Sequence, residues 1–380
     1  MDRLLCEILA SAAQKPEIRE ALHDPKAIDA VIRSAAREQL LPALHEAVVR
    51  HFSAEISKLD RMVLAVAHEN NRRRNRMIRD LLVEIGLAAQ HRGFDLIALK
   101  GGHWILEDTE GFAPWRWMLD VDILVEPENY DQMPELLAGL GYAPASPRPQ
   151  LFRQRRERGH YHLPPHTRNG LPTFIEVHRH AGWRPDLMPT ELMFAQRRVV
   201  APGLAVAPPW CAAGHAIVHW LVQHDALRRR EGPLRAVFEV ARHLERSDID
   251  FDQLIRHAER VGMRPEIDVA VAFTIELFGV QAPAGLTPSK AACRHVARCL
   301  AARHSPKRAW IARERAGVLA MWDCKRSMYR CYLRNYGPVR TMATLWSNRL
   351  IRAPLMIVRA FQVIAITIAK LPFASKAPAP

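Results

Sequence analysis

Cysteine is scarce and scattered in this chain. Six cysteines occur in 380 residues, with no C-x-x-C pair and no regular spacing between them. This pattern argues against a structural zinc site and is typical of proteins in a reducing compartment. Residues 1–20 contain no long apolar core after a basic start, so we expect no secretory signal. These absences predict a cytoplasmic protein.

Lysine is also scarce, although the chain as a whole is basic. Only nine of the 54 basic residues are lysines, and the formal net charge is +14. Such an excess favours phosphate-rich partners or anionic membrane surfaces, although a preference for arginine codons would explain it equally well. Apolar residues at 49% and charged residues at 25% are the composition of a globular protein, and the length suggests two or three domains.

The pattern of apolar residues changes twice along the chain. Apolar residues at three- and four-residue spacings predict an N-terminal helical region over 1–92. Short apolar strands alternating with helices predict a core of strands and helices over 93–205. Amphipathic helices return over 206–345 as a C-terminal helical domain, and 346–380 is predicted to form an amphipathic helix with a Pro- and Ala-rich tail.

Two predicted strands of the core carry acidic residues among apolar ones. In "LDVDILV" (119–125), strand alternation directs Asp120 and Asp122 to one face. In "TFIEVHRH" (173–180), Glu176 and His178 share a face in the same way. If the two strands are adjacent, three carboxylates meet in one cleft. Such a set suits Mg²⁺, and two ions would stabilise both oxygens of an in-line phosphoryl displacement.

The segments "LKGGHWIL" and "RWMLDVDILVEPENYDQMPELLAGLGY" together resemble the minimal nucleotidyltransferases of the DNA polymerase β superfamily. More specifically, they resemble a bacterial branch of this superfamily that has a Leu-Lys-Gly turn, an Arg before an Asp-x-Asp strand and a Leu-Gly-Tyr helix end. It implies an α+β fold, with a mixed sheet and its helices flanked by N- and C-terminal helical regions. It also implies transfer of a nucleoside monophosphate from an NTP to an acceptor hydroxyl, with release of pyrophosphate.

The resemblance also implies roles for individual residues. Asp120, Asp122 and Glu176 would be the catalytic residues and the ligands of two Mg²⁺ ions, with Glu176 polarising the acceptor hydroxyl. The residues that would bind the nucleotide are Lys100, Gly101, Gly102 and Arg116. Lys100 and Arg116 carry charge that can neutralise phosphate. His178, which shares a face with Glu176, is a candidate substrate contact or proton shuttle.

Each of these assignments has a structural alternative. Arg116 could pair with an acid of its own loop (Glu107, Asp108 or Glu110), Glu176 could pair with Arg179, and the aspartates could sit on a solvated strand edge. The histidines at 160, 162, 166, 178 and 180 could bind zinc, although they lack the helical H-x-x-x-H spacing with a nearby acid. His215 and His219, one helical turn apart, are expected to pack behind the site.

The C-terminal part leaves the partners open. Basic residues interleaved with Trp and Tyr fill 303–340, and residues 349–373 could lie on an anionic membrane surface or dock on the protein's own core. The charge-free stretch 360–369 is too short to span a bilayer about 30 Å thick. Two rival functions therefore remain: a catalytically silent assembly or regulatory protein, with a role in envelope polysaccharide production, and an arginine-rich nucleic-acid-binding protein. The acceptor hydroxyl is not identified.

Overall fold

A computed structural model describes residues 2–10, 16–108, 110–145, 161–171, 173–224, 226–229 and 232–303. The predicted C-terminal segment 346–380 lies outside these residues, as does the basic stretch before it. The prediction that 349–373 contacts a membrane surface or docks on the core therefore falls on residues that are not described. Within them, no helix has the length and apolar character needed to cross a membrane.

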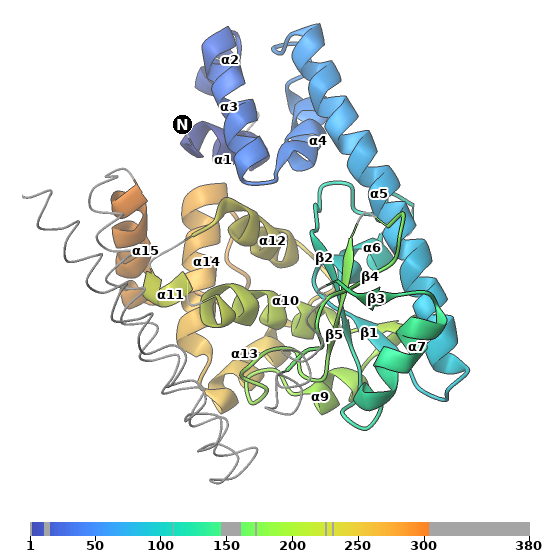
Figure 1. Cartoon of the computed structure of the whole chain (residues 1–380). Helices are drawn as coiled ribbons and strands as arrows, with labels where there is room; N and C mark the ends of the chain where they lie inside the picture. The colour runs from blue at the N-terminus through green and yellow to red at the C-terminus, as the bar shows by residue number, and fades with distance from the viewer. Residues whose placement is uncertain are drawn as a thin grey trace, which may run out of the picture.

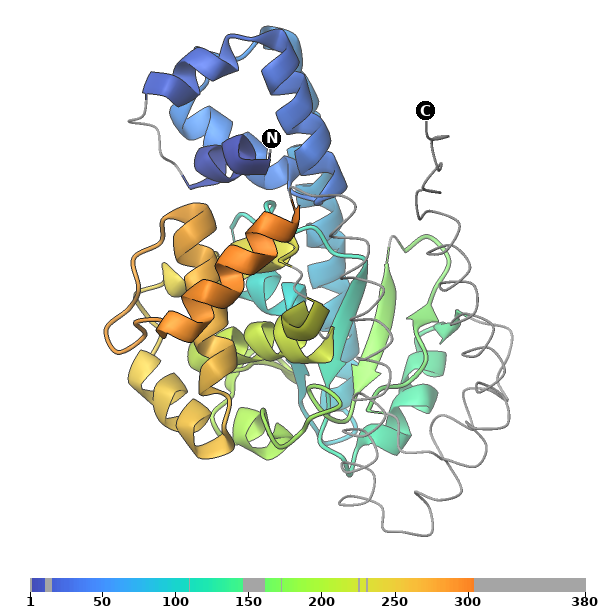
Figure 2. The same cartoon turned by 90° about the vertical axis from the view of Figure 1, so that its left-hand side faces the viewer.

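The N-terminal region consists of helices joined to the rest of the molecule by one long helix. Four short helices, α1 (Asp2–Leu9), α2 (Pro16–Leu22), α3 (Pro25–Arg37) and α4 (Leu41–His51), precede α5 (Lys58–Gln90). The hydroxyl of Ser57 accepts from the backbone N–H of Asp60 and so caps the N-terminus of α5. At 33 residues, α5 is about 50 Å long. It runs from the N-terminal helices down the whole side of the sheet (Figures 1 and 2).

A seven-stranded mixed sheet forms the centre of the described structure. Its strands are β1 (Leu96–Ala98), β2 (Asp120–Leu124), β3 (Ala143–Pro144), β4 (His166–Thr167), β5 (Phe174–His178), β6 (Arg198–Ala201) and β7 (Leu204–Val206), in the order β3-β4-β5-β2-β1-β7-β6. The β2/β5 and β1/β7 pairs are parallel, and the other pairs are antiparallel. The two acid-bearing strands are therefore direct neighbours.

Because side chains alternate along each strand, the two faces of the sheet carry different residues. Val121, Ile123 and Val177 pack with the second half of α5 and with α7 (Met133–Gly139) in one hydrophobic cluster. Asp120, Asp122 and Glu176 alternate with them and so point to the opposite face. On that face, Leu124 belongs to the larger cluster formed with the C-terminal helices. The acidic residues thus lie between the sheet and the C-terminal helices.

Short helical segments complete the sheet region, and a set of helices follows it (Figure 1). The former are α6 (Gly101–Glu107), the 3₁₀ turn η1 (Tyr130–Gln132) and α9 (Thr190–Ala195). The latter are α10 (Pro209–Ile217), η2 (Val218–Gln223), α11 (Ala226–Arg229), α12 (Leu234–Leu244), α13 (Phe251–Val261), α14 (Arg264–Phe278) and α15 (Lys290–Arg303). Gly262 and Gly279 end α13 and α14 in the left-handed conformation that glycine tolerates. The predicted α+β fold, a mixed sheet flanked by helical regions, is confirmed.

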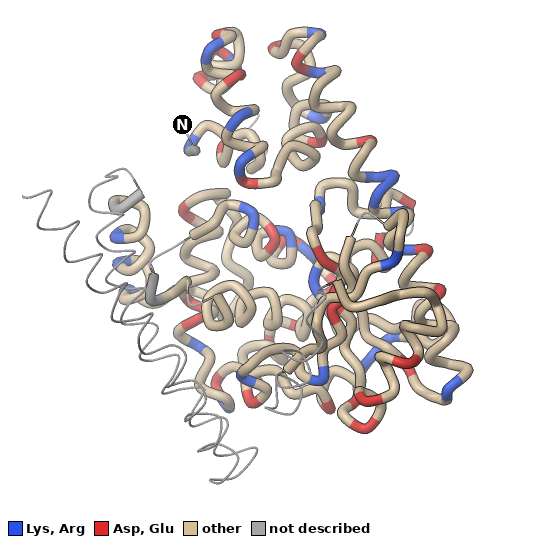
Figure 3. The backbone as a smooth tube through the Cα atoms, in the orientation of Figure 1, with Lys and Arg blue, Asp and Glu red and all other residues tan. Residues whose placement is uncertain are grey.

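Charged residues of both signs occur throughout the described helices and strands. Figure 3 shows lysine and arginine interspersed with aspartate and glutamate, with a basic stretch near the middle of α5. That stretch is "RRRNRMIR" (72–79). Part of it faces the loop that leads into β2, where it contributes to the site described next.

Candidate active site

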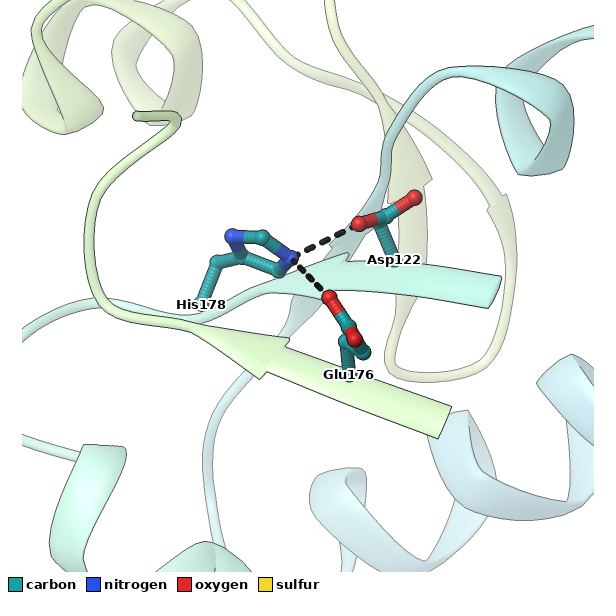
Figure 4. A group of neighbouring side chains, drawn as sticks. All are labelled: Asp122, Glu176 and His178. Carbon is teal, nitrogen blue, oxygen red and sulfur yellow. Dashed lines mark hydrogen bonds and ion pairs between the residues drawn. The ribbon is translucent and has the colours of Figure 1, made fainter. Parts of the chain in front are cut away.

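The register of β2 against β5 aligns the predicted acidic residues. Asp120 is opposite Phe174, Asp122 opposite Glu176, and Leu124 opposite His178. Aligned residues of parallel neighbours project to the same face, so Asp122, Glu176 and His178 converge (Figure 4). One ligand atom of each lies within 4.8 Å of the others, and this is the group of potential metal ligands found in the described part of the chain.

Asp122 is a buried carboxylate held by two cationic or potentially cationic groups. Its Oδ1 accepts a hydrogen bond from Lys100 Nζ at 2.9 Å and one from His178 Nε2 at 2.8 Å. The Asp122 side chain is only 2% exposed. Burial alone would raise the pKa of Asp122, but the charge of Lys100 and the hydrogen bond from His178 outweigh it and hold that pKa well below its ordinary value. Asp122 is therefore ionised at neutral pH.

Glu176 has the opposite electrostatic environment. Its Oε2 lies 3.8 Å from His178 Nε2, and its side chain is 20% exposed. Burial, followed by the negative charges of Asp122 and Asp120, raises the pKa of Glu176 to about 7. Among the described residues, no Lys or Arg forms an ion pair with this carboxyl, which leaves it suited to bind a cation or accept a proton. The alternative pairing with Arg179 is not formed, because that guanidinium lies over the ring of Tyr130 at 5.5 Å.

Asp120 lies beside this group rather than in it. It is half-buried at the start of β2, and the group within 4.8 Å contains His178 where we expected Asp120. Its charge nevertheless acts on Glu176, and on the guanidinium groups of Arg74 and Arg235. Asp120 thus faces the same cleft from a position closer to the N-terminus of the strand.

Lys100 and the two glycines after it connect β1 to α6. Lys100 has φ = 51°, a conformation that is costly for a residue other than glycine, and such strain is concentrated at functional sites. Its side chain is directed to Asp122. Gly101 and Gly102 are buried, and a Cβ on Gly101 would collide with the side chain of Met118. The glycines allow α6 to pack closely against the segment before β2; a contact between them and phosphate stays a prediction.

Arg116 is engaged by a residue far away in the sequence. Its Nη2 lies 2.9 Å from Glu239 Oε2 on α12, its Nε donates to the same carboxylate, and its Nη1 donates to the carbonyl oxygen of Trp117 at 2.6 Å. The expected alternative, an ion pair within its own loop, is not the one formed: Glu107 pairs with Arg198 and Arg246. Arg116 therefore ties the loop before β2 to the C-terminal helices, and a phosphate contact would require the Glu239 pair to open.

Two buried asparagines of α5 form hydrogen bonds with the loop that leads into β2. Asn71 Nδ2 donates to the carbonyl oxygens of Pro114 and Arg116, at 2.7 and 3.1 Å. Asn75 Nδ2 donates to the carbonyls of residues 112, 113 and 116. The loop includes two non-glycine residues at positive φ, Phe112 at 62° and Ala113 at 42°. These hydrogen bonds stabilise a strained loop and thereby fix the start of β2.

Several neighbours of the site were not anticipated from the sequence. Tyr161 stacks near His178, with ring centroids 5.7 Å apart, and accepts a hydrogen bond from Gln223 Nε2 at 2.7 Å. Burial and the charge of Glu176 raise the pKa of Tyr161 to about 12, so it is a neutral phenol. Gln223 comes from the π-helix η2, an element common at functional sites. No periodicity in the sequence predicts this π-turn.

The remaining histidines do not form the zinc site considered above. His162 Nδ1 and His166 Nδ1 contact backbone carbonyls, of Leu163 and Pro164, and among the described histidines only His178 joins the metal-ligand group. His160 lies outside the described residues. His215 donates to the carbonyl of Ala181 at 2.9 Å, and burial, with the charge of Lys100, lowers its pKa to about 4. It packs behind the site as a neutral imidazole, as expected.

Comparison with known proteins agrees with this arrangement. Residues 24–279 match the family described as "Uncharacterised nucleotidyltransferase". The matched range includes all of the described sheet and every residue of the acidic cluster. No curated protein and no solved structure matches the chain significantly. Because the family match covers more than half of its length, the chain belongs to this family and is a nucleotidyltransferase.

Proposed function

We propose that the protein transfers a nucleoside monophosphate from an NTP to an acceptor hydroxyl, in a reaction that depends on Mg²⁺ and releases pyrophosphate. The observation that carries the proposal is the in-register pair Asp122 and Glu176 on parallel strands, with Asp120 two residues away on the same face. A family of nucleotidyltransferases needs a cation-binding carboxylate set next to phosphate, and this cluster is the candidate for it.

The donor set fits a divalent cation. Carboxylate oxygens are the ligands that Mg²⁺ prefers. Burial, followed by the nearby charges of Asp122 and Asp120, raises the pKa of Glu176, and a bound cation would offset both effects. In this proposal Asp120, Asp122 and Glu176 hold two Mg²⁺ ions. When bound, the cations stabilise negative charge on the attacking and leaving oxygens.

The protein residues have distinct roles in the proposal. Glu176 orients the acceptor hydroxyl and polarises it. His178 fixes the rotamer of Asp122 through its hydrogen bond and contacts the substrate. An ammonium group has three donors, so Lys100 can bind Asp122 and a phosphate oxygen together. Gly101, Gly102 and Arg116 complete the proposed nucleotide site.

The wider assignments belong to the same proposal. We infer membership of the bacterial branch with the Leu-Lys-Gly turn, on the strength of "LKGG" and "RWMLDVD". We also infer a cytoplasmic enzyme with peripheral contact to an anionic membrane surface through 349–373. The excess of arginine supports an anionic partner, which includes the NTP itself.

The test is label transfer. Full-length protein is incubated with each α-labelled NTP, Mg²⁺ and a fractionated host-cell lysate, and labelled products are separated and identified. We expect label in an acid-stable product with one NTP, and loss of labelling with EDTA, Asp122→Asn or Glu176→Gln. Glu135→Gln is the matched control, because Glu135 is exposed on α7, outside the acidic cluster.

Two outcomes would refute the proposal. Undiminished labelling by both Asp122→Asn and Glu176→Gln would show that the cluster is not the catalytic site. Failure of every NTP to label any fraction, while the protein is folded and Mg²⁺ is present, would favour the catalytically silent alternative.

A further inference from the structure

The outer face of α5 carries a row of exposed apolar side chains near the start of the helix. Their positions follow the i, i+3, i+4, i+7 spacing, which places them on one face of a helix. The row consists of Leu59, Met62, Val63 and Val66, with exposed fractions of 70%, 55%, 46% and 58%. We call it the α5 apolar row. Single exposed apolar side chains are ordinary, but a contiguous set marks an interaction site.

The opposite face of the same helix segment is the one that packs. Leu64 is fully buried, in the larger hydrophobic cluster that also contains Leu44 and Val48 of α4. Figure 1 shows that α4 and the first half of α5 lie beyond the sheet, at the edge of the molecule. The core of the described structure therefore does not use the α5 apolar row.

The exposed charges next to this row are basic. Arg50, in the last turn of α4, and Lys58, the first residue of α5, are both exposed. In 46–66, a range that the structure describes throughout, no acidic residue is fully exposed, and each has a partner. These pairs are Glu46 with His68, Glu55 with Arg19, and Asp60 with the hydroxyl of Ser57. The surface thus presents apolar side chains flanked by positive charge.

The same face of α5 changes its charge further along the helix. Arg73 lies two turns after Val66 and is 73% exposed, and Arg76 is also exposed. Asp80 and Glu84 follow on this face and are acidic. An anionic surface would attract the first half of the face and repel the second half, so such a contact would be confined to the start of α5.

We propose that the start of α5 and the end of α4 bind an anionic lipid surface. The α5 apolar row inserts among the lipid headgroups, and Arg50 and Lys58 lie beside the lipid phosphates. An interfacial helix needs an apolar face flanked by cations, which these residues provide, and the net charge of +14 favours the same partner.

A lipid surface fits this row better than a second protein does. A stable protein interface buries about 800 Å² on each partner, whereas the row extends over only about 10 Å of one helix. The inference rests neither on the contact proposed for 349–373 nor on nucleotidyl transfer. Because a single weak membrane contact is reversible, two such surfaces together would give a more stable attachment.

Co-sedimentation of the full-length protein with vesicles tests the apolar part of the contact. Vesicles of phosphatidylcholine mixed with phosphatidylglycerol are compared with vesicles of phosphatidylcholine alone. We expect binding to the mixed vesicles, and weaker binding at higher salt because the charges are screened. The double variant Leu59→Gln with Val66→Gln should weaken this binding about tenfold. Leu87→Gln is the matched control and should not, because Leu87 is a 44% exposed leucine at the other end of α5.

The basic part of the contact is tested in the same assay. The double variant Arg50→Gln with Lys58→Gln should weaken binding to the mixed vesicles about fivefold for each charge removed. It should also reduce the dependence of binding on salt. Arg256→Gln, at an exposed arginine of α13, should change neither quantity. All of these positions are exposed, so thermal melts of the variants should match that of the wild-type protein.

Three outcomes would overturn the inference. The first is that the wild-type protein does not bind the mixed vesicles. The second is that both double variants bind them as tightly as the wild-type protein does, which would leave any membrane contact to other residues. The third is a wild-type dimer in light scattering that Leu59→Gln with Val66→Gln converts to a monomer while vesicle binding is unchanged. That result would assign the α5 apolar row to an interface with a second copy of the chain.

Discussion

For Asp122→Asn, the strand pattern alone and the folded structure predict opposite effects on stability. From the strand alone, replacing either aspartate should relieve repulsion between carboxylates and raise stability. The structure reverses that expectation for Asp122, because Lys100 and His178 both donate to its Oδ1 within 2.9 Å. Asp120 is half-buried and has no such pair of donors in the part of the chain that the structure describes.

The magnitude follows from the two hydrogen bonds. A hydrogen bond to a charged group contributes about 1.5–3 kcal/mol and a neutral one about 0.5–1.5 kcal/mol. Asparagine keeps an oxygen acceptor but removes the charge, so each bond loses about 1 kcal/mol, and Lys100 is left 14% exposed without a counter-ion. We expect Asp122→Asn to lower the free energy of unfolding by about 2–3 kcal/mol. Asp120→Asn should change it by no more than about 0.5 kcal/mol.

The measurement is denaturant-induced unfolding of the wild-type protein and both variants at pH 6 with EDTA. At this pH Glu176, with a pKa of about 7, is largely protonated, so relief of its repulsion contributes little. Asp122, whose pKa is depressed, is fully ionised. Its contribution is present above the unfolded-state pKa of about 3.9 and is lost as the pH falls below it. If Asp122→Asn is as stable as Asp120→Asn at pH 6, the Lys100–Asp122–His178 arrangement is wrong.

Three further predictions concern residues around the site. Burial lowers the pKa of His103 to about 4, and neither of its ring nitrogens has a hydrogen-bond partner among the described residues. At pH 5 the imidazole of His103 is protonated in the unfolded chain but not in the folded one, which should lower the free energy of unfolding by about 2 kcal/mol. Between pH 7.5 and 5, His103→Leu should therefore lose less thermal stability than the wild-type protein. Equal losses would refute this. Gly101→Ala should destabilise the protein by about 1–3 kcal/mol because the new Cβ collides with Met118. Gly102→Ala should destabilise it less in the same thermal melts, because the nearest atom to its new Cβ is Ala98 Cβ at 3.2 Å. Glu239→Gln should cost about 1–2 kcal/mol and slow label transfer by loosening Arg116, whereas Glu245→Gln, at an exposed pair with Arg242, should do neither.

Local sequence patterns were sufficient to place the acidic strands. Alternation of apolar and acidic residues predicted a strand over 119–125, and β2 occupies Asp120–Leu124. The same argument predicted a strand in 173–180, where β5 occupies Phe174–His178. Because a strand has a period of two, the facing of Asp120 relative to Val121 is a local property that the sequence specifies. The mixed sheet and its flanking helices followed from the resemblance and are confirmed by the structure.

The partners of these residues could not be deduced in the same way. Asp122 meets Lys100, 22 residues earlier, and His178, 56 residues later. Those contacts depend on β2 lying between β1 and β5, an order that no single-strand pattern contains. The expectation that Lys100 is available to phosphate took no account of the aspartate beside it. Arg116 illustrates the same limit, since its counter-ion Glu239 lies on α12 and not in the adjacent loop.

Buried polar residues on otherwise apolar helix faces are a signal that sequence reasoning could have used. Asn71 and Asn75 are one turn apart in α5, on the side that continues into Ile78 and Leu82 of the core. Asparagine is a weak helix former and is rarely fully buried, so a pair at this spacing implies specific hydrogen-bond partners. Those partners are the carbonyls of the strained loop before β2. The loop's position, and through it that of Asp120 and Trp117, thus depends on two amides about 45 residues away in the chain.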